Sequence, residues 1–219
     1  MKYNKSASVE SYFDGSSGKW DEIYSTDGGD FYNYLNRILR KGVYNRAKRT
    51  LEIVSAERAR VNSLIDIGCG SGRLAVPLAT MGIKVTGIDF AKSMIDLAIE
   101  HAKNNKVEDN VSFIQADFMK HSFQPKDFDV SIAMGVFDYI AFPKQFMEKM
   151  KYVTSYMILV TFPIKGTFRS YIRSIRLALK NCPVYYYTEE MILNMLSKMQ
   201  FANYDIERVN NQYYVKIFI

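Results

Sequence analysis

From Ser63 onward, short apolar runs alternate with segments that carry apolar residues at helical spacing. The expected strands are residues 63–68, 84–89, 111–117, 128–135 and 156–162, and the expected helices between them are residues 72–82, 92–105 and 143–153. Strands that are apolar throughout and are joined to helices by short connections indicate a parallel sheet with helices on both faces. The sequence therefore predicts an α/β, doubly wound fold.

Both ends of the chain depart from this alternation. Before it, residues 31–59 show helical spacing of apolar side chains. After it, residues 188–199 predict a helix with Thr188 as its N-cap. Two strands then follow, residues 203–209 and 213–219, around an Asn210-Asn211 turn, which is typical of an antiparallel hairpin.

Composition excludes several classes of protein. With 48% hydrophobic and 24% charged residues, the chain has the composition of a soluble globular protein. Neither an apolar signal-peptide core nor a run of the roughly 20 apolar residues that a membrane-spanning helix needs occurs in it. The 2 cysteines suggest neither a disulfide framework nor a zinc site, so we expect a cytoplasmic protein without a metal.

The stretch "LIDIGCGSGRLAVPLA", residues 64–79, places a glycine loop between the first strand and the next helix. A phosphate-binding P-loop needs Lys-Ser/Thr after its last glycine, but Arg73-Leu74 follows Gly72. The dinucleotide fingerprint needs a third glycine where Arg73 stands. The P-loop reading therefore fails, and a nicotinamide-binding Rossmann protein is disfavoured by the tight glycine spacing.

Acidic residues stand at the ends of three successive expected strands: Asp66, Asp89 and Asp117. Open α/β sheets bind ligands at this carboxyl edge. Three carboxylates would repel a pyrophosphate, whereas a cationic nucleoside such as S-adenosylmethionine suits them. Asp66 is placed to reach an ammonium group, and Asp89 to accept hydrogen bonds from ribose hydroxyls.

The motifs "LIDIGCGSG", "GIDFAKSMIDLA", "FIQADF" and "FDVSIAMGVFDYI" resemble those of class I S-adenosylmethionine-dependent methyltransferases, in the same order. The resemblance covers about residues 20–219 and implies a Rossmann-like, mostly parallel seven-stranded sheet that ends in an antiparallel hairpin. It implies that S-adenosylmethionine is the cofactor. The cofactor-binding residues that it implies are Asp66, Gly68, Cys69, Gly70, Gly72, Asp89, Phe90, Met94, Asp117, Phe118, Met134 and Gly135.

The acceptor is expected beside the loop after the fourth strand. Methyltransferases of nucleic-acid amines resemble one another in an Asn/Asp-Pro-Pro-aromatic motif there, and the chain instead has Met-Gly-Val-Phe at residues 134–137. This difference counts against nucleic acid as a partner. Many small-molecule members carry a histidine where the chain has Tyr139. Asp138 and Tyr139 are the candidate catalytic residues, and both histidines, His101 and His121, are expected at the solvated surface.

The N-terminal stretch "SVESYFDGSSGKWDEIYS" resembles the entry segment of magnesium-protoporphyrin O-methyltransferases. The resemblance implies lid residues near the cofactor or the acceptor at Tyr12, Trp20 and Tyr24. An alternative remains that Trp20 and Tyr24, four residues apart, attach a helix to the core.

The net charge of +6 is unevenly distributed, and two segments carry a large excess of basic residues. Residues 37–60 hold 8 basic and 2 acidic residues. In residues 165–180, Arg169, Arg173 and Arg176 fall on one face of an expected amphipathic helix. That face has three readings: it clamps an anionic acceptor, it lies on an acidic membrane surface, or it is simply solvated.

Together these features predict a helical lid segment over residues 1–60 and a cofactor-binding domain over 61–219, with a helical insertion at about 164–187. The leading hypothesis is a methyltransferase acting on a small acidic or amphiphilic acceptor, at oxygen, with a tetrapyrrole carboxylate as the named acceptor. Two alternatives remain, an RNA methyltransferase and a non-catalytic S-adenosylmethionine-binding module. The sequence offers no pattern from which to infer an oligomeric state.

Overall fold

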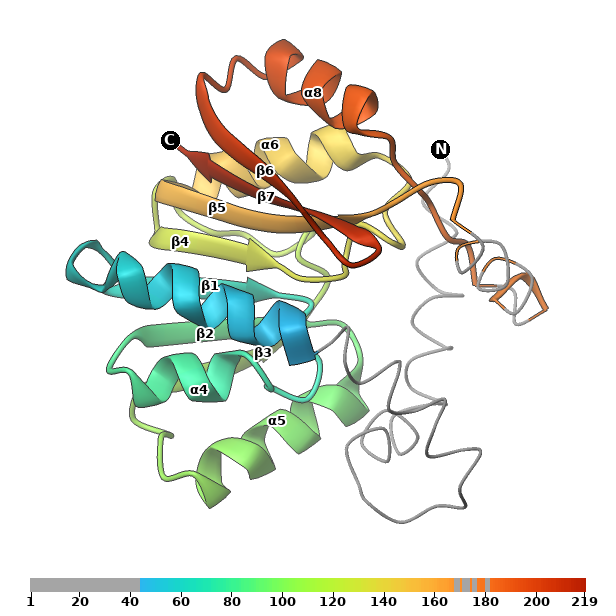
Figure 1. The fold of residues 1–219 in the computed structure, drawn as a ribbon. Coiled ribbons are helices and arrows are strands. Elements are labelled where there is room, and N and C mark those ends of the chain that lie inside the picture. Colours follow the sequence, from blue (N-terminus) through green and yellow to red (C-terminus); the bar gives the residue numbers. More distant parts are fainter. Residues whose placement is uncertain (1–43, 168–169, 171–173, 175–176, 180–181) are drawn as a thin grey trace.

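The computed structural model describes residues 44–167, 170, 174, 177–179 and 182–219 (Figure 1). Seven strands form one sheet in the order β3-β2-β1-β4-β5-β7-β6. The strands are β1 (Ser63–Ile67), β2 (Lys84–Asp89), β3 (Val111–Gln115), β4 (Phe128–Ala133), β5 (Thr154–Pro163), β6 (Asn203–Val209) and β7 (Gln212–Phe218). The sheet confirms the predicted doubly wound α/β fold.

Strands β1 to β5 pair in parallel, and β7 is antiparallel to both of its neighbours, β5 and β6. The hairpin forms as predicted, and Asn210 in its turn has a φ of +56°, a value that Asn tolerates better than most residues. Because the five parallel strands end at one edge of the sheet, the loops that follow them gather there.

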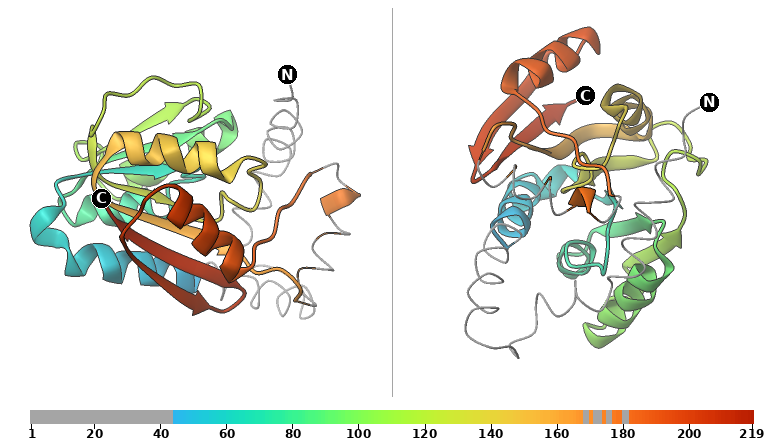
Figure 2. Two further views of the ribbon diagram at one scale, coloured as in Figure 1. Left: turned by 90° about the horizontal axis from the view of Figure 1, so that it is seen from above. Right: turned by 90° about the vertical axis from the view of Figure 1, so that its right-hand side faces the viewer.

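Helices cover both faces of the sheet (Figure 2). A helix over residues 44–56 and α4 (Ala75–Thr80) pack on one face, where Val54, Leu78 and Leu64 of β1 share one core. α6 (Pro143–Val153) and α8 (Glu189–Lys198) pack on the other, where Met147 and Ile192 join Ile65 of β1. Neighbouring residues of β1 thus belong to opposite cores, as strand geometry requires.

The remaining helical elements are α5 (Lys92–Asn104) and a 3-10 turn, η1 (Arg58–Arg60). Thr188 caps α8 as predicted, because its Oγ1 accepts a hydrogen bond of 3.3 Å from the Met191 amide. Glu189 and Glu190 in the first turn of α8 and Lys198 in its last turn complement the helix dipole.

Several element boundaries differ from the prediction, and β3 and β4 end two residues early, at Gln115 and Ala133. α4 begins at Ala75 rather than near Gly72, because Gly72 has a φ of +76°, which a right-handed helix cannot contain. β5 extends past both predicted ends, to Thr154 and Pro163. Of the predicted helix 31–59, residues 44–56 are helical, and the part before residue 44 lies outside the described residues.

The described part of the predicted lid segment, residues 44–60, packs against the sheet. Arg49 Nη2 lies 2.8 Å from Glu207 Oε2 on β6, and the buried Thr50 hydroxyl is hydrogen-bonded to the Tyr214 hydroxyl on β7. The domain boundary near residue 60 remains a prediction. No helix among the described residues is long and apolar enough to cross a bilayer.

Candidate functional site

The glycine loop after β1 depends on backbone conformations that side chains disfavour. Gly68, Gly70 and Gly72 have φ values of +69°, +52° and +76°, in the left-handed region that glycine enters at no steric cost. At Gly68 space is also lacking, since a Cβ atom there would lie 2.6 Å from Cγ2 of Val136. The loop therefore passes against the turn that follows β4.

Hydrogen bonds fix the loop to the neighbouring strand. The amides of Gly68 and Cys69 donate to the Ile88 carbonyl at 2.8 and 3.2 Å. One residue on, Asp89 Oδ2 accepts from the Gly70 amide at 3.0 Å, and Asp89 Oδ1 accepts from the Ala91 amide at 3.0 Å. The Asp89 carboxylate is thereby held at the carboxyl end of β2, where the sequence placed it for ribose hydroxyls.

Asp66 is an acid of the site whose pKa is strongly shifted. Its side chain is 2% exposed, and its Oδ2 has no hydrogen-bond partner among the described residues. Burial and the nearby Asp89 charge raise the pKa of Asp66 to about 7, while a hydrogen bond from the Ala75 amide opposes that rise. A buried carboxylate oxygen without a donor suits a cationic ligand, since an ammonium group supplies both charge and hydrogen bonds.

Cys69 has a small buried side chain between the loop and β2. A Cβ atom on Gly87 would lie 2.6 Å from Cδ1 of Phe113 and 3.0 Å from the Cys69 sulfur, so the Phe113 ring and the thiol together fill the space that Gly87 leaves. Burial and the charges of Asp66 and Asp89 raise the pKa of the Cys69 thiol well above its usual range. It is therefore a poor nucleophile.

Four of the residues that the resemblance implies for the cofactor, Phe90, Met94, Asp117 and Phe118, lie in separate places. Phe90, after β2, joins an apolar cluster with Tyr139, and Met94 is buried on α5. The Phe118 ring is 5% exposed and packs in the core, 5.1 Å from the Phe146 ring centroid. Asp117 Oδ1 accepts from the Met119 amide at 2.9 Å, so its side chain caps the following turn.

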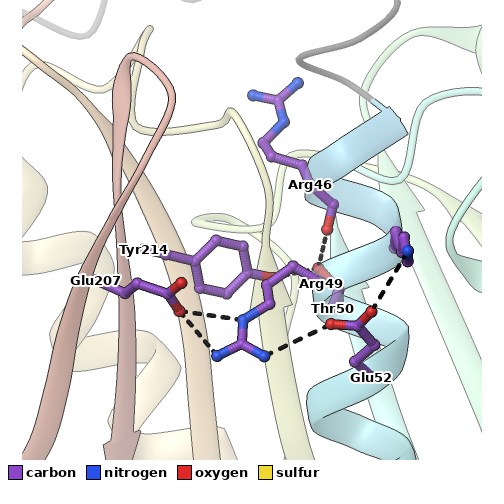
Figure 3. A network of polar contacts seen from close by, with 7 residues as sticks. Arg46, Arg49, Thr50, Glu52, Glu207 and Tyr214 are labelled. Carbon is purple, nitrogen blue, oxygen red and sulfur yellow. Dashed lines mark hydrogen bonds and ion pairs between the residues drawn. The ribbon is translucent and has the colours of Figure 1, made fainter.

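Met134 and Gly135 directly follow β4, beside the glycine loop. Gly135 has a φ of +82°, and its amide donates to Thr161 Oγ1 at 2.9 Å. A Cβ atom at Gly135 would lie 2.8 Å from Nη1 of Arg46. The same Nη1 donates to Gln212 Oε1 at 3.0 Å. Arg46, whose place on the helix 44–56 is seen in Figure 3, therefore extends to the end of β4.

Arg46 is the site residue that sequence reasoning missed. It was counted among the basic residues of 37–60 without a separate role. The available signal was topological: a helix joined to β1 by a short connection runs antiparallel to it, so its first turn lies at the carboxyl edge of the sheet. Thr50, one turn later, donates to the Arg46 carbonyl at 2.9 Å and fixes the same turn to β7 through Tyr214.

The candidate catalytic residues lie on the turn after β4. Asp138 is 2% exposed, and its carbonyl accepts a hydrogen bond of 2.8 Å from the Tyr185 amide. Tyr139 packs in an apolar cluster with Phe90 and with residues of the insertion, Leu177, Cys182 and Val184. The structure thus brings the turn and the insertion together beside the cofactor loop.

The predicted lid residues Tyr12, Trp20 and Tyr24 lie outside the described residues, as do Arg169, Arg173 and Arg176. The expectation that both histidines are simply solvated is wrong. His101 is partly buried, and its Nδ1 lies 2.7 Å from the Ser71 carbonyl of the glycine loop. His121 is partly buried as well, and its ring lies 4.6 Å from the Phe123 ring.

Comparisons with known proteins give consistent results. A family model described as "Methyltransferase domain" matches residues 61–207. A ubiquinone biosynthesis O-methyltransferase of Pelagibacter ubique is 30% identical over 143 residues, covering 64% of the chain and 58% of that protein. A mitochondrial ubiquinone biosynthesis O-methyltransferase of Arabidopsis thaliana is 32% identical over 90 residues, 41% of the chain and 28% of that protein. The chain thus spans less than two thirds of the length of these relatives.

The fold resembles solved methyltransferase structures. The magnesium protoporphyrin IX methyltransferase of Synechocystis with bound S-adenosylhomocysteine gives a TM-score of 0.78 at 18% identity, covering 96% of the chain and 97% of that protein. The same enzyme with S-adenosylmethionine gives a TM-score of 0.75 at 20% identity, covering 96% and 94%. At these identities the likeness concerns the fold.

Proposed function

The chain belongs to the methyltransferase domain family, and from that premise we propose that it transfers a methyl group from S-adenosylmethionine to an oxygen atom of a small amphiphilic acceptor. The bound cofactor supplies the methyl group and a sulfonium leaving group. The chain itself holds the two reactants in line and excludes water, which is the main task in such a displacement.

The observation that carries this proposal is the pair of carboxylates at the glycine loop. Asp66 offers a buried oxygen to which none of the described residues donates, and Asp89 is held at the end of β2 by the Gly70 and Ala91 amides. We assign Asp66 to the ammonium group and Asp89 to the ribose. The remaining assigned cofactor residues are those named from the sequence, with Arg46 added beside Gly135.

The acceptor must supply an oxygen atom as the nucleophile. A carboxylate attacks without losing a proton, whereas a phenol must give its proton to a base. Asp138 is buried, and the described turn over residues 134–142 contains no histidine. We therefore favour a carboxylate, with magnesium protoporphyrin as the first compound to test. Asp138 and Tyr139 are assigned to the acceptor side.

A phenolic acceptor is the second candidate, because the relatives that match in sequence are named ubiquinone biosynthesis O-methyltransferases. For either acceptor, we assign Tyr12, Trp20 and Tyr24 to a lid, and Arg169, Arg173 and Arg176 to an anionic group or an acidic membrane surface. A cytoplasmic location belongs to the same proposal.

The test uses purified full-length protein and methyl-labelled S-adenosylmethionine. Magnesium protoporphyrin is added to one reaction, a prenylated catechol to a second, and fractionated cell extract to a third. Alkali releases label from a methyl ester but not from an aryl methyl ether, so it distinguishes the two acceptors. Asp66→Asn is the control, and we expect it to lose labelling together with cofactor binding.

Alkali-labile label on the porphyrin supports the favoured acceptor, and alkali-stable label on the catechol supports the second. Label that enters only RNA overturns the small-molecule proposal in favour of an RNA methyltransferase. Cofactor binding without label in any fraction overturns the enzymatic proposal and supports a binding module.

A further inference from the structure

The turn after β4 is held by the far end of the insertion. Within the turn, the Tyr139 amide donates to the Val136 carbonyl at 2.9 Å. Three other carbonyls of the turn accept hydrogen bonds from residues 185–187: that of Asp138 from the Tyr185 amide, and those of Phe137 and Ile140 from the Tyr187 hydroxyl, each at 3.3 Å. One hydroxyl hydrogen thus serves two carbonyls.

Tyr187 is itself firmly placed. Its amide donates to the Pro163 carbonyl and its carbonyl accepts from the Lys165 amide, both at 2.9 Å. Its backbone is therefore paired alongside the end of β5. Its side chain is 5% exposed, and its ring meets that of Phe162 edge-on at 4.9 Å. Burial raises the pKa of Tyr187 above its usual range, which keeps the hydroxyl a neutral donor.

The turn lies between the cofactor loop and the insertion. At its start, Val136 fills the space beside Gly68. Near its end, Tyr139 packs with Phe90 on the cofactor side and with Leu177 and Cys182 of the insertion. A shift of the turn would therefore change the wall on the acceptor side and leave Asp66 and Asp89, on other strands, in place.

We propose that Tyr187 is a positioning residue for methyl transfer: its hydroxyl ties the turn of residues 137–140 to the end of β5 and so sets the position of the acceptor-side wall. The inference rests on the proposed function for its catalytic consequence. Its structural part, that the hydroxyl holds the turn, is measurable without any acceptor.

The decisive variant is Tyr187→Phe, which keeps the ring against Phe162 and removes only the hydroxyl. Tyr156→Phe is the matched control, because it also removes one tyrosine hydroxyl, which lies near the opposite end of β5. That hydroxyl donates to Glu57 Oε2 at 2.6 Å and accepts from Arg60 Nη1 at 3.3 Å. Amide hydrogen exchange of the free protein is measured first. We expect faster exchange at the Tyr139 and Tyr185 amides, with the Tyr187 amide unchanged.

Steady-state kinetics follow, with whichever acceptor the wild type labels. We expect kcat/KM for the acceptor to fall about ten- to a hundredfold in Tyr187→Phe, because small misplacements of reacting groups are costly. Affinity for S-adenosylhomocysteine should stay within about twofold of the wild type, since the cofactor-binding carboxylates do not move. Tyr156→Phe should retain wild-type kinetics even if its stability falls.

Unchanged exchange at Tyr139 and Tyr185 overturns the inference, whether or not an acceptor has been found. Accelerated exchange with an unchanged kcat/KM also overturns it, because the turn would then move without consequence for transfer. A wild-type protein that labels no acceptor contradicts the proposed function, and the exchange measurement still decides whether Tyr187 holds the turn.

Discussion

Asp89 Oδ2 lies 3.0 Å from the Gly70 amide nitrogen, so the acid assigned to the ribose also holds the middle of the glycine loop. Ligand recognition and loop conformation thus depend on one side chain. A carboxylate that accepts backbone amides at both oxygens makes charge-assisted hydrogen bonds, which are stronger than neutral ones.

We therefore predict that Asp89→Asn weakens binding of S-adenosylhomocysteine about ten- to a hundredfold, since hydrogen bonds to a charged group contribute about 1.5–3 kcal/mol. Isothermal titration calorimetry measures the change. Asp96→Asn is the control, because Asp96 is exposed on α5 and pairs only with Lys92 at 2.6 Å among the ion pairs of the described residues. Equal affinities for the two variants would refute the assignment of Asp89.

The raised pKa of Asp66 makes the free energy of unfolding depend on pH. Its pKa is raised to about 7, so between about pH 4 and pH 7 the folded protein binds a proton that the unfolded chain releases. This group's contribution to the free energy of unfolding therefore falls as pH rises through that window, by up to about 4 kcal/mol, and is flat above it. Asp66→Asn should become more stable relative to wild type from pH 5 to pH 7.5, as urea unfolding at several pH values will show. A constant difference would contradict the raised pKa.

Gly68 and Gly70 allow backbone strain to be separated from a steric clash. Both have a positive φ, but a Cβ atom at Gly68 would meet Val136 at 2.6 Å, whereas at Gly70 it would meet no atom of the described residues within 4 Å. We expect Gly70→Ala to cost about 1 kcal/mol of unfolding free energy and Gly68→Ala about 2–4 kcal/mol. Val136→Ala should recover part of the Gly68→Ala loss in thermal unfolding. Equal losses of unfolding free energy at the two glycines would mean that the turn after β4 moves away from the new Cβ atom at no cost in stability.

Arg46 places a guanidinium beside Gly135, opposite in charge to Asp66. A zwitterionic methionine end needs both signs of charge, so Arg46→Met should weaken S-adenosylhomocysteine binding about tenfold, the loss of one charge-assisted hydrogen bond. Lys48→Met, at an exposed position of the same helix, is the control. If the two variants bind S-adenosylhomocysteine equally well, Arg46 has no role in cofactor binding and serves only to hold Gln212.

The Thr50–Tyr214 pair should respond asymmetrically to mutation. Thr50 also donates to the Arg46 carbonyl, so in Tyr214→Phe its hydroxyl keeps a partner, and the cost should be about 1 kcal/mol. In Thr50→Val the buried Tyr214 hydroxyl loses its partner, and the cost should be about 2–3 kcal/mol. A double-mutant cycle by urea unfolding measures both costs and their coupling. A larger loss in Tyr214→Phe would contradict this hydrogen-bond arrangement.

The sequence predicted the parts of the fold that local pattern controls. Apolar strands, the Thr188 cap and the Asn210-Asn211 turn each have a signal within a few residues. Asp66 and Asp89 were also predictable, because parallel strands bring their carboxyl ends to one edge. The start of α4 was missed because only the actual φ of Gly72 shows that the helix cannot include it.

Residues that act across the fold were not predictable in the same way. Arg46 reaches Gly135 from a helix 89 positions earlier in the chain, and Tyr187 reaches Phe137 across 50 positions. His101 bonds the Ser71 carbonyl across 30 positions. These contacts depend on how helices and the insertion pack on the sheet, and no short motif encodes that packing.

The position of β7 between β5 and β6 has a consequence for biosynthesis. β7 is synthesised after β6 but lies inside the sheet, so one edge of β5 stays unpaired until β7 has left the ribosome. The helix over residues 44–56 waits about as long, because its partners Glu207 and Tyr214 lie on β6 and β7. A nascent chain released before residue 212 would expose an open, apolar strand edge, the kind of surface that chaperones bind and that aggregation starts from.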